Sequence, residues 1–374
     1  MNEKLVPRVV MTVVPMLTPN DVTGVVAAFR DGRVDPQAII AVIGKSEGQG
    51  LHNDYGRLFA EISLKNAIAV ARGTSIDQVG DTVTFVVSGG TPGVISPHAT
   101  LVTQEWVPAN EALDKSGQGG LVVGRAHTEE ILPEEIGRMG QINKVAAAVQ
   151  EAMATAGIAD PKDVHLVMAK GPALSQRSID DAHSRGNSVV TLDPGIGPMG
   201  SMCWSNDAAA LGEVERSLIT DAIVREDWSL YSSVAITSAG GEKRRGEVIV
   251  MGNRLDSASD IRIGHGITAD FADTGGVLEA LRDAGLEFQC MPSDSDKKRI
   301  VQVFAKFALP GTNVLRGAHI TMLDDHEAHH VAKAVGGALV VSVTGKPASF
   351  ISGGERNSHM GPPGANPVAA VISR

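Results

Sequence analysis

The 374-residue sequence contains few cysteines and few aromatic residues. Its two cysteines, Cys203 and Cys290, lack the spacing of a metal knuckle, and no charged and then apolar leader opens the chain, so we expect a reducing cytoplasm. No apolar run is long enough to cross a membrane. The net charge of −10 comes without a basic run, which argues against nucleic acid or an anionic membrane as the main partner. A small molecule is the expected partner.

What the sequence does contain is a long internal repeat. In each copy an apolar, strand-like run ends in lysine, an alanine-rich helical stretch follows, and a second apolar run ends in a serine before small residues, as in "AITSAGGE". The lysine and serine are 43, 68 and 46 residues apart in the three copies, so the middle copy carries an insertion. The pairs are Lys45 and Ser88, Lys170 and Ser238, and Lys306 and Ser352.

The repeat predicts an α/β fold of three similar units around a pseudo-threefold axis. Polar, Gly- and Ser-rich stretches near 111–120 and 252–260 are suitable boundaries. We therefore expect unit A at 1–110, unit B at 111–254 and unit C at 255–374. None of these units offers a complete pocket alone, whereas assembly around one axis brings three strand ends together.

The recurring residue types favour hydrolysis of an amide. A serine hydroxyl is a weak nucleophile unless a base takes its proton, and a lysine amine can do so when burial or a second cation lowers its pKa. Three neighbouring lysines make loss of one charge easier. The small residues after each serine let backbone N–H groups approach a carbonyl oxygen as it becomes an oxyanion.

Nearly the whole chain resembles the ring-opening amidohydrolases, which comprise cyanuric acid hydrolases and barbiturases. The resemblance runs through "AVIGKSEGQGLHNDYGR", "SGGTPGVISPHAT", "GRAHTEEILPEEIG", "LRGAHITMLDD" and "GPPGANPVAAVI". It implies three units packed as a triangular prism, a substrate ring at the centre and commonly a homotetramer. It also implies Ser238 as nucleophile and Lys170 as base. The substrate-binding residues that we expect are Arg57, Lys45, Lys306, Asn206, Ser88, Gly89, Ala239, Ser352 and Gly353.

The sequence departs from the family pattern at three places. Cyanuric acid hydrolases contribute one arginine per unit; Arg57 fits the first, Asn206 stands at the second and the third falls near Ala332, with His329 or Lys333 as possible replacements. Fewer guanidinium groups favour a barbiturate-like ring over cyanuric acid. The family's metal-binding glutamate falls on Ala308, so we expect no required cofactor and no structural metal there.

Two alternatives stay open from the residues alone. The segment "HEAHH" matches the H-E-x-x-H pattern, in which His326 and His330 would bind zinc and Glu327 would act as base of a zinc-dependent hydrolase. Its plainer interpretation is the solvated start of a helix. The other alternative is a protein that binds a small ring without turning it over.

Overall fold

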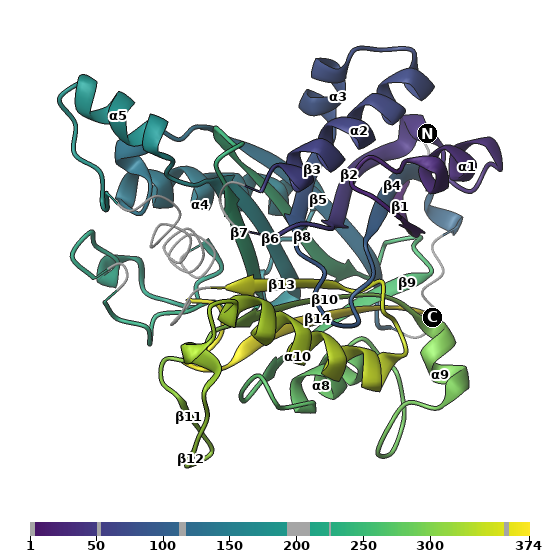
Figure 1. Cartoon of the computed structure of the whole chain (residues 1–374). Helices are drawn as coiled ribbons and strands as arrows, with labels where there is room; N and C mark the ends of the chain where they lie inside the picture. The colour runs from purple at the N-terminus through teal and green to yellow at the C-terminus, as the bar shows by residue number, and fades with distance from the viewer. Residues whose placement is uncertain (1–3, 51–53, 112–116, 193–209, 224–225, 355–358) are drawn as a thin grey trace.

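Three four-stranded sheets with one shared strand order form the framework of the molecule (Figure 1). The computed structural model describes residues 4–50, 54–111, 117–192, 210–223, 226–354 and 359–374. The sheet of unit A has the order β1 (Leu5–Pro15), β4 (His98–Pro108), β2 (Ile39–Ser46), β3 (Thr84–Gly89). In unit B the order is β5 (Gly120–Glu130), β8 (Arg245–Arg254), β6 (Val164–Pro172), β7 (Ala235–Gly240). Unit C repeats it with β9 (Ile261–Thr268), β14 (Asn366–Ser373), β10 (Ile300–Ala308), β13 (Phe350–Gly354).

Each sheet places one parallel pair beside antiparallel strands. The lysine strand and the serine strand of a unit run parallel, so a crossover must connect them, and helices supply most of it. The helices of the described residues are α1 (Thr23–Arg30), α2 (Tyr55–Arg72), α3 (Ile76–Thr82), α4 (Met139–Ala156), α5 (Gln176–Ser184), α8 (Gly275–Asp283), α9 (Asp294–Arg299) and α10 (Ala328–Thr344). A short hairpin, β11 (Val314–Leu315) with β12 (Ala318–His319), precedes α10.

The two faces of each sheet have different neighbours. Alternate apolar residues of all three sheets, such as Ile43, Met168 and Phe304, pack into one central cluster. The residues between them point outward, and helices cover them in three separate clusters. Successive side chains of a strand point to opposite faces, so an apolar strand that is buried on both faces contributes every second residue to each cluster. The predicted α/β class with three repeated units is therefore confirmed; the unit boundaries stay predictions, although the strands of each sheet lie inside one predicted unit.

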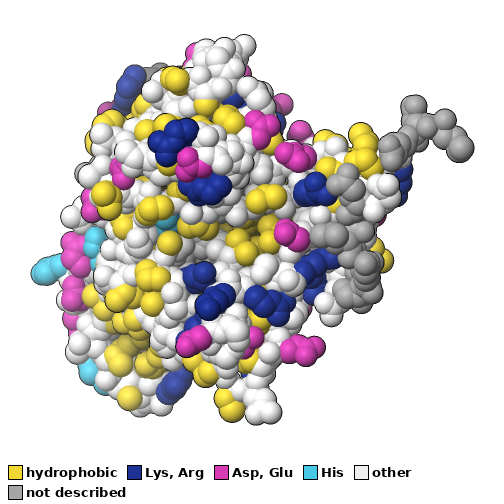
Figure 2. Space-filling view, turned by 90° about the vertical axis from the view of Figure 1, so that its right-hand side faces the viewer, with side chains coloured by type: hydrophobic (Ala, Val, Ile, Leu, Met, Phe, Trp, Pro, Cys, Tyr) yellow, Lys and Arg dark blue, Asp and Glu magenta, His cyan; other side chains and the backbone are white. Residues whose placement is uncertain are grey.

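Two further observations concern the charged side chains of the surface and the length of the helices. Figure 2 shows acidic and basic side chains interspersed on the face that carries α1 and α9. Within the described residues, no helix has both the length and the apolar character needed to cross a membrane.

Candidate active site

The lysine and serine of each repeat lie directly opposite each other on neighbouring parallel strands. The register pairs Lys45 with Ser88 in unit A, and the same pairing holds for the other two units. Side chains of residues opposite each other in a ladder point to the same face, about 4.8 Å apart. The two remaining pairs are Lys170 with Ser238 and Lys306 with Ser352.

All three lysines are buried: Lys45 is 0% exposed, Lys170 1% and Lys306 3%. Lys45 Nζ lies 3.3 Å from Ser88 Oγ, and Lys306 Nζ lies 3.4 Å from Ser352 Oγ. Burial holds the pKa of Lys45 well below its ordinary value, and the nearby charges of Lys333 and Lys306 add to the effect. The predicted lysine and serine pairs thus exist as contacts in units A and C.

Lysines of one unit also reach the serine strand of another unit. Lys170 Nζ of unit B donates a hydrogen bond to the carbonyl oxygen of Val87 in unit A. Lys306 Nζ of unit C donates to the carbonyl oxygen of Thr237 in unit B, at 2.7 Å. Val87 and Thr237 each immediately precede the serine of their own unit. These contacts bring the three repeated pairs together, as the pseudo-threefold arrangement requires.

The pair in unit B differs from the other two. Ser238 Oγ is shielded from solvent and has no hydrogen-bond partner among the described residues. Lys170 Nζ instead lies 2.7 Å from Oε1 of Glu242. Burial lowers the pKa of Lys170, Glu242 raises it, and Arg57 and Lys243 lower it, so that the pKa stays below its ordinary value.

Glycine allows the Glu242 carboxylate to occupy this place. A Cβ atom on Gly240 would lie 2.1 Å from Oε2 of Glu242, far inside van der Waals contact. The carboxylate also accepts a 2.9 Å hydrogen bond from Arg57 Nε. Burial raises the pKa of Glu242, but the charges of Lys170 and Arg57 outweigh burial and lower the pKa to about 2. Glu242 is therefore ionised between two cations.

Helix α2 of unit A contributes to an ionic seam, by which we mean the ion pairs between units A and B that Arg57, Glu61, Glu242 and Lys243 form. Asp54 caps the helix by accepting a hydrogen bond from the Gly56 N–H, which places Arg57 in the first turn and Glu61 one turn later. Glu61 Oε2 lies 2.9 Å from Nζ of Lys243, the residue after Glu242. The seam therefore pairs charges of opposite sign from units A and B.

Lys333 of α10 brings a further cation to the centre. A Cβ atom on Gly353 would lie 2.9 Å from Lys333 Cγ, and one on Gly90 would lie 2.6 Å from Lys333 Nζ. The side chain therefore passes over the serine turn of unit C and ends at that of unit A. Burial and the charge of Lys306 lower the pKa of Lys333 to about 8.

The remaining predicted site residues fall into three groups. Gly89 lies beside the cap of α2, where a Cβ would be 2.1 Å from Asp54 Oδ2, so only glycine fits. Ala239 is buried after Ser238, and its predicted contact to substrate, like those of Gly89 and Gly353, stays a prediction. Asn206, like Cys203, lies outside the described residues.

The histidine segment does not form the geometry of a zinc peptidase. Helix α10 begins at Ala328, so His326 lies before the helix and does not share a helical face with His330. His330 Nδ1 lies 3.2 Å from Glu327 Oε2, and its other ring nitrogen contacts the carbonyl oxygen of Gln49, which His329 also approaches. The arrangement argues against the zinc hydrolase alternative.

Sequence reasoning missed Glu242, Lys243 and Glu61. The first two were visible at the end of "AITSAGGEK", where charge follows two glycines. Glu61 stands four residues after Arg57, a spacing that puts both on one face of a helix. No local pattern shows that this face meets the Glu242 loop, because the contact joins two units.

Comparison with known proteins agrees with the geometry. A model of the amidohydrolase ring-opening proteins matches residues 10–373. A cyclic amide hydrolase of Pseudofrankia inefficax is 63% identical over 374 residues, which cover 98% of this chain and 95% of the relative. Barbiturase 1 of a Nocardioides species is 40% identical, with 96% and 97% covered. A solved structure of a cyanuric acid hydrolase matches with a TM-score of 0.91 and 37% identity, covering 99% of this chain and 100% of that one.

The molecule is a hydrolase built from three repeated α/β units. The chain belongs to the family of ring-opening amidohydrolases.

Proposed function

We propose that the protein opens a planar cyclic amide or imide ring by a serine–lysine mechanism centred on unit B. The main support for this proposal is that Ser238 lies in register with Lys170, while Ser238 Oγ has no hydrogen-bond partner among the described residues. In units A and C the same register brings Nζ within 3.3 Å and 3.4 Å of the serine oxygen. By analogy with units A and C, we expect rotation of the Lys170 side chain away from Glu242 to bring Nζ within reach of Ser238 Oγ.

The reaction begins when neutral Lys170 takes the hydroxyl proton and Ser238 Oγ attacks a ring carbonyl carbon. The tetrahedral intermediate carries its negative charge on the former carbonyl oxygen, which we assign to backbone N–H groups of the serine turns. The C–N bond then breaks, and the ring nitrogen takes the proton from Lys170. Water attacks the resulting ester with Lys170 again as base, which releases the ring-opened acid and restores Ser238.

Glu242 acts on Lys170 as the third group of a triad. An ionised carboxylate beside a lysine stabilises the ammonium form that each proton transfer creates, and it fixes the direction of the side chain. The 2.7 Å contact supports this role, as does the low pKa of Glu242. Glu242 is therefore proposed as a positioning residue, while Ser238 and Lys170 are catalytic.

For the substrate we propose a barbiturate-like ring, with cyanuric acid as the second candidate. The relatives include a barbiturase, and the similar solved structures include a cyanuric acid hydrolase, so similarity supports both candidates. Arg57 and Lys333 offer charge from units A and C, whereas unit B offers Asn206 in place of the family's arginine. A ring with one ionisable edge fewer than cyanuric acid, such as barbiturate, loses the least binding free energy when asparagine stands in place of that arginine.

A substrate panel tests the proposed function. Purified, chelator-treated protein is assayed by substrate depletion with barbituric acid, cyanuric acid and a cyclic imide. We expect turnover without added metal and a higher kcat/KM for barbituric acid. Asn206→Arg should move the preference toward cyanuric acid by about tenfold to a hundredfold, the value of one charge-assisted hydrogen bond. Binding without turnover of any ring would favour the non-catalytic alternative. Dependence of turnover on added zinc, together with inactivity of His326→Ala, would contradict the serine mechanism.

A pH-dependent KM is expected from Lys333. Below its pKa of about 8 the ammonium is charged and attracts an anionic ring; above that pH the attraction is lost and KM rises. Lys333→Met should raise KM about tenfold to a hundredfold at pH 7 and remove this step, whereas Lys333→Arg should keep KM low to higher pH. The measurement is KM from pH 6 to 10 for the three proteins. Equal pH profiles for wild type and Lys333→Met would exclude Lys333 from substrate binding.

A further inference from the structure

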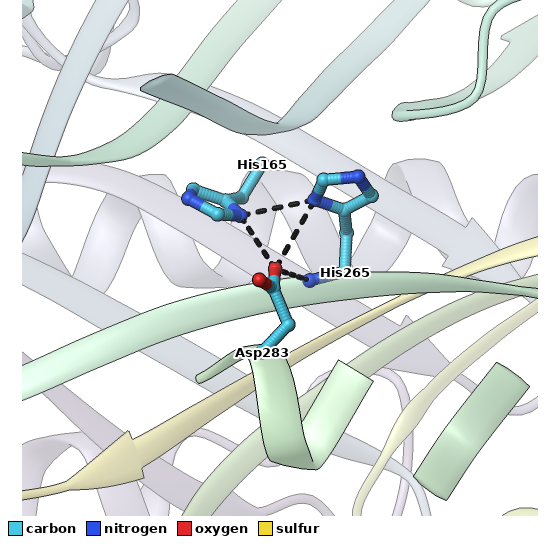
Figure 3. Close-up of side chains that lie close together, drawn as sticks. All are labelled: His165, His265 and Asp283. Atoms are coloured by element: carbon cyan, nitrogen blue, oxygen red, sulfur yellow. Dashed lines mark hydrogen bonds and ion pairs between the residues drawn. The ribbon is translucent and has the colours of Figure 1, made fainter. Parts of the chain in front are cut away.

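Three side chains of types that can bind a metal ion converge where units B and C meet (Figure 3). His165 comes from β6, His265 from β9 and Asp283 from the last residue of α8. The two Nδ1 atoms are 3.0 Å apart; Asp283 Oδ2 lies 3.0 Å from Nδ1 of His165 and 3.4 Å from that of His265. Three potential ligand atoms thus face one another at similar distances.

These separations match the ligand edges of a tetrahedral metal site. Zinc holds imidazole nitrogen and carboxylate oxygen at about 2.0–2.2 Å, which places neighbouring ligands about 3.3–3.6 Å apart around a tetrahedron, within a few tenths of an ångström of the three separations. Two histidines and one carboxylate are also a donor set that suits first-row divalent ions. The side chains are 15%, 32% and 39% exposed, respectively, so water has access to a fourth position.

The surroundings prepare the ligands. The backbone N–H of His265 donates a 2.9 Å hydrogen bond to Asp283 Oδ2 and thereby orients the carboxylate. Glu279 and Glu213 are further acidic groups near His265.

Comparison of the repeats shows that the fold does not require this cluster. His165 stands five residues before its lysine, at a register irregularity that recurs in all three lysine strands, and the matching residues are Ile40 and Val301. Arg125 of β5 occupies the position in its sheet that His265 occupies in the sheet of unit C. In each unit this residue pairs with a residue of the adjacent antiparallel strand, and that residue pairs in turn with the position two residues before the repeat lysine. The backbone N–H of Arg125 donates to Thr155. The corresponding place between units A and B therefore has Ile40, Arg125 and Thr155 instead of His165, His265 and Asp283.

We propose that His165, His265 and Asp283 bind one zinc ion, which joins units B and C. The site lies along β6 from Lys170, at a distance of roughly 16 Å for five strand residues, so its role is to hold the two units together and not to take part in ring opening. It is also separate from Ala308, the position at which the family resemblance implies a metal ligand.

Zinc binding by the full-length protein tests the proposal. Chelator-treated protein is titrated with Zn²⁺ by calorimetry at pH 7.5, and melting temperature is recorded with and without the ion. We expect one high-affinity equivalent and a higher melting temperature, since an ion that binds the folded state stabilises it. His165→Ala and His265→Ala should each weaken binding by at least about tenfold and abolish the thermal shift.

Two further variants keep the test decisive. Asp283→Asn preserves the side-chain shape and can still accept the hydrogen bond from His265, so it should fold normally yet bind zinc more weakly. His319→Ala, on the exposed hairpin strand β12, is the matched control and should bind as the wild type does. Absence of saturable binding would overturn the proposal. So would loss of binding in His330→Ala with normal binding in His165→Ala, because the ion would then occupy the Glu327, His329 and His330 cluster.

Discussion

Ser238→Ala is expected to abolish ring opening, with kcat lower by about four to six orders of magnitude, because no other group on the proposed path forms the ester intermediate. Lys170→Met should have a similar effect, since it removes the base and leaves an apolar side chain of comparable length. The double variant should be little worse than either single variant, as expected for a nucleophile and base that act as one unit. Single-turnover and steady-state rates with the preferred ring provide the measurement.

The serines of the other units are the matched controls. Ser88→Ala and Ser352→Ala remove hydroxyl groups at the same register position, and each of those hydroxyls already contacts a lysine. We expect these variants to raise KM more than they lower kcat. If Ser88→Ala or Ser352→Ala abolished turnover while Ser238→Ala retained it, the nucleophile would belong to a different unit.

Glu242→Gln is expected to lower kcat by about a hundredfold to ten-thousandfold while preserving the shape of the side chain. The amide cannot stabilise the lysine ammonium that forms in the reaction. The pH profile should move as well. Lys170 works as a base only when neutral, so kcat/KM falls as pH drops through its pKa; because Glu242 raises that pKa, its removal should shift the acid limb to lower pH.

Glu61→Gln is the control for Glu242→Gln. It also removes a buried carboxylate from the ionic seam, but the Glu61 carboxylate contacts Lys243 and Lys65, whereas that of Glu242 contacts Lys170. Melting temperatures should fall for both variants, since each leaves a buried cation with one partner fewer. A rate for Glu242→Gln within threefold of wild type, or an acid limb that moves to higher pH, would show that Glu242 has only a structural role.

The sequence predicted the parts of the fold that repeat and missed the contacts that do not. Three lysines and three serines stand out because the same pattern recurs, and the structure puts each lysine opposite its serine. The pairing of Arg57 with Glu242 has no such signal, because it joins positions 185 residues apart in two units.

The direction of the Lys333 side chain was equally hard to predict from the sequence. Lys333 was one of two candidates for the missing cation of unit C, next to Ala332 at the aligned position. Sequence alignment gives the position of a backbone atom, whereas a lysine side chain spans several ångströms and its direction depends on packing. Here Gly353 and Gly90 leave the space through which Lys333 passes.

The two ends of the described chain meet the same short segment between units B and C. Pro7 accepts a hydrogen bond from the backbone of Ala258, and Arg374 donates one to Asp260, each at 2.8 Å. Figure 1 shows both termini on the same side of the molecule. The three units thus close into a ring, and their packing does not determine between which two units the chain begins. A circular permutation that joins the present ends and opens the chain between two units would preserve the three sheets, because each sheet takes all its described strands from one unit.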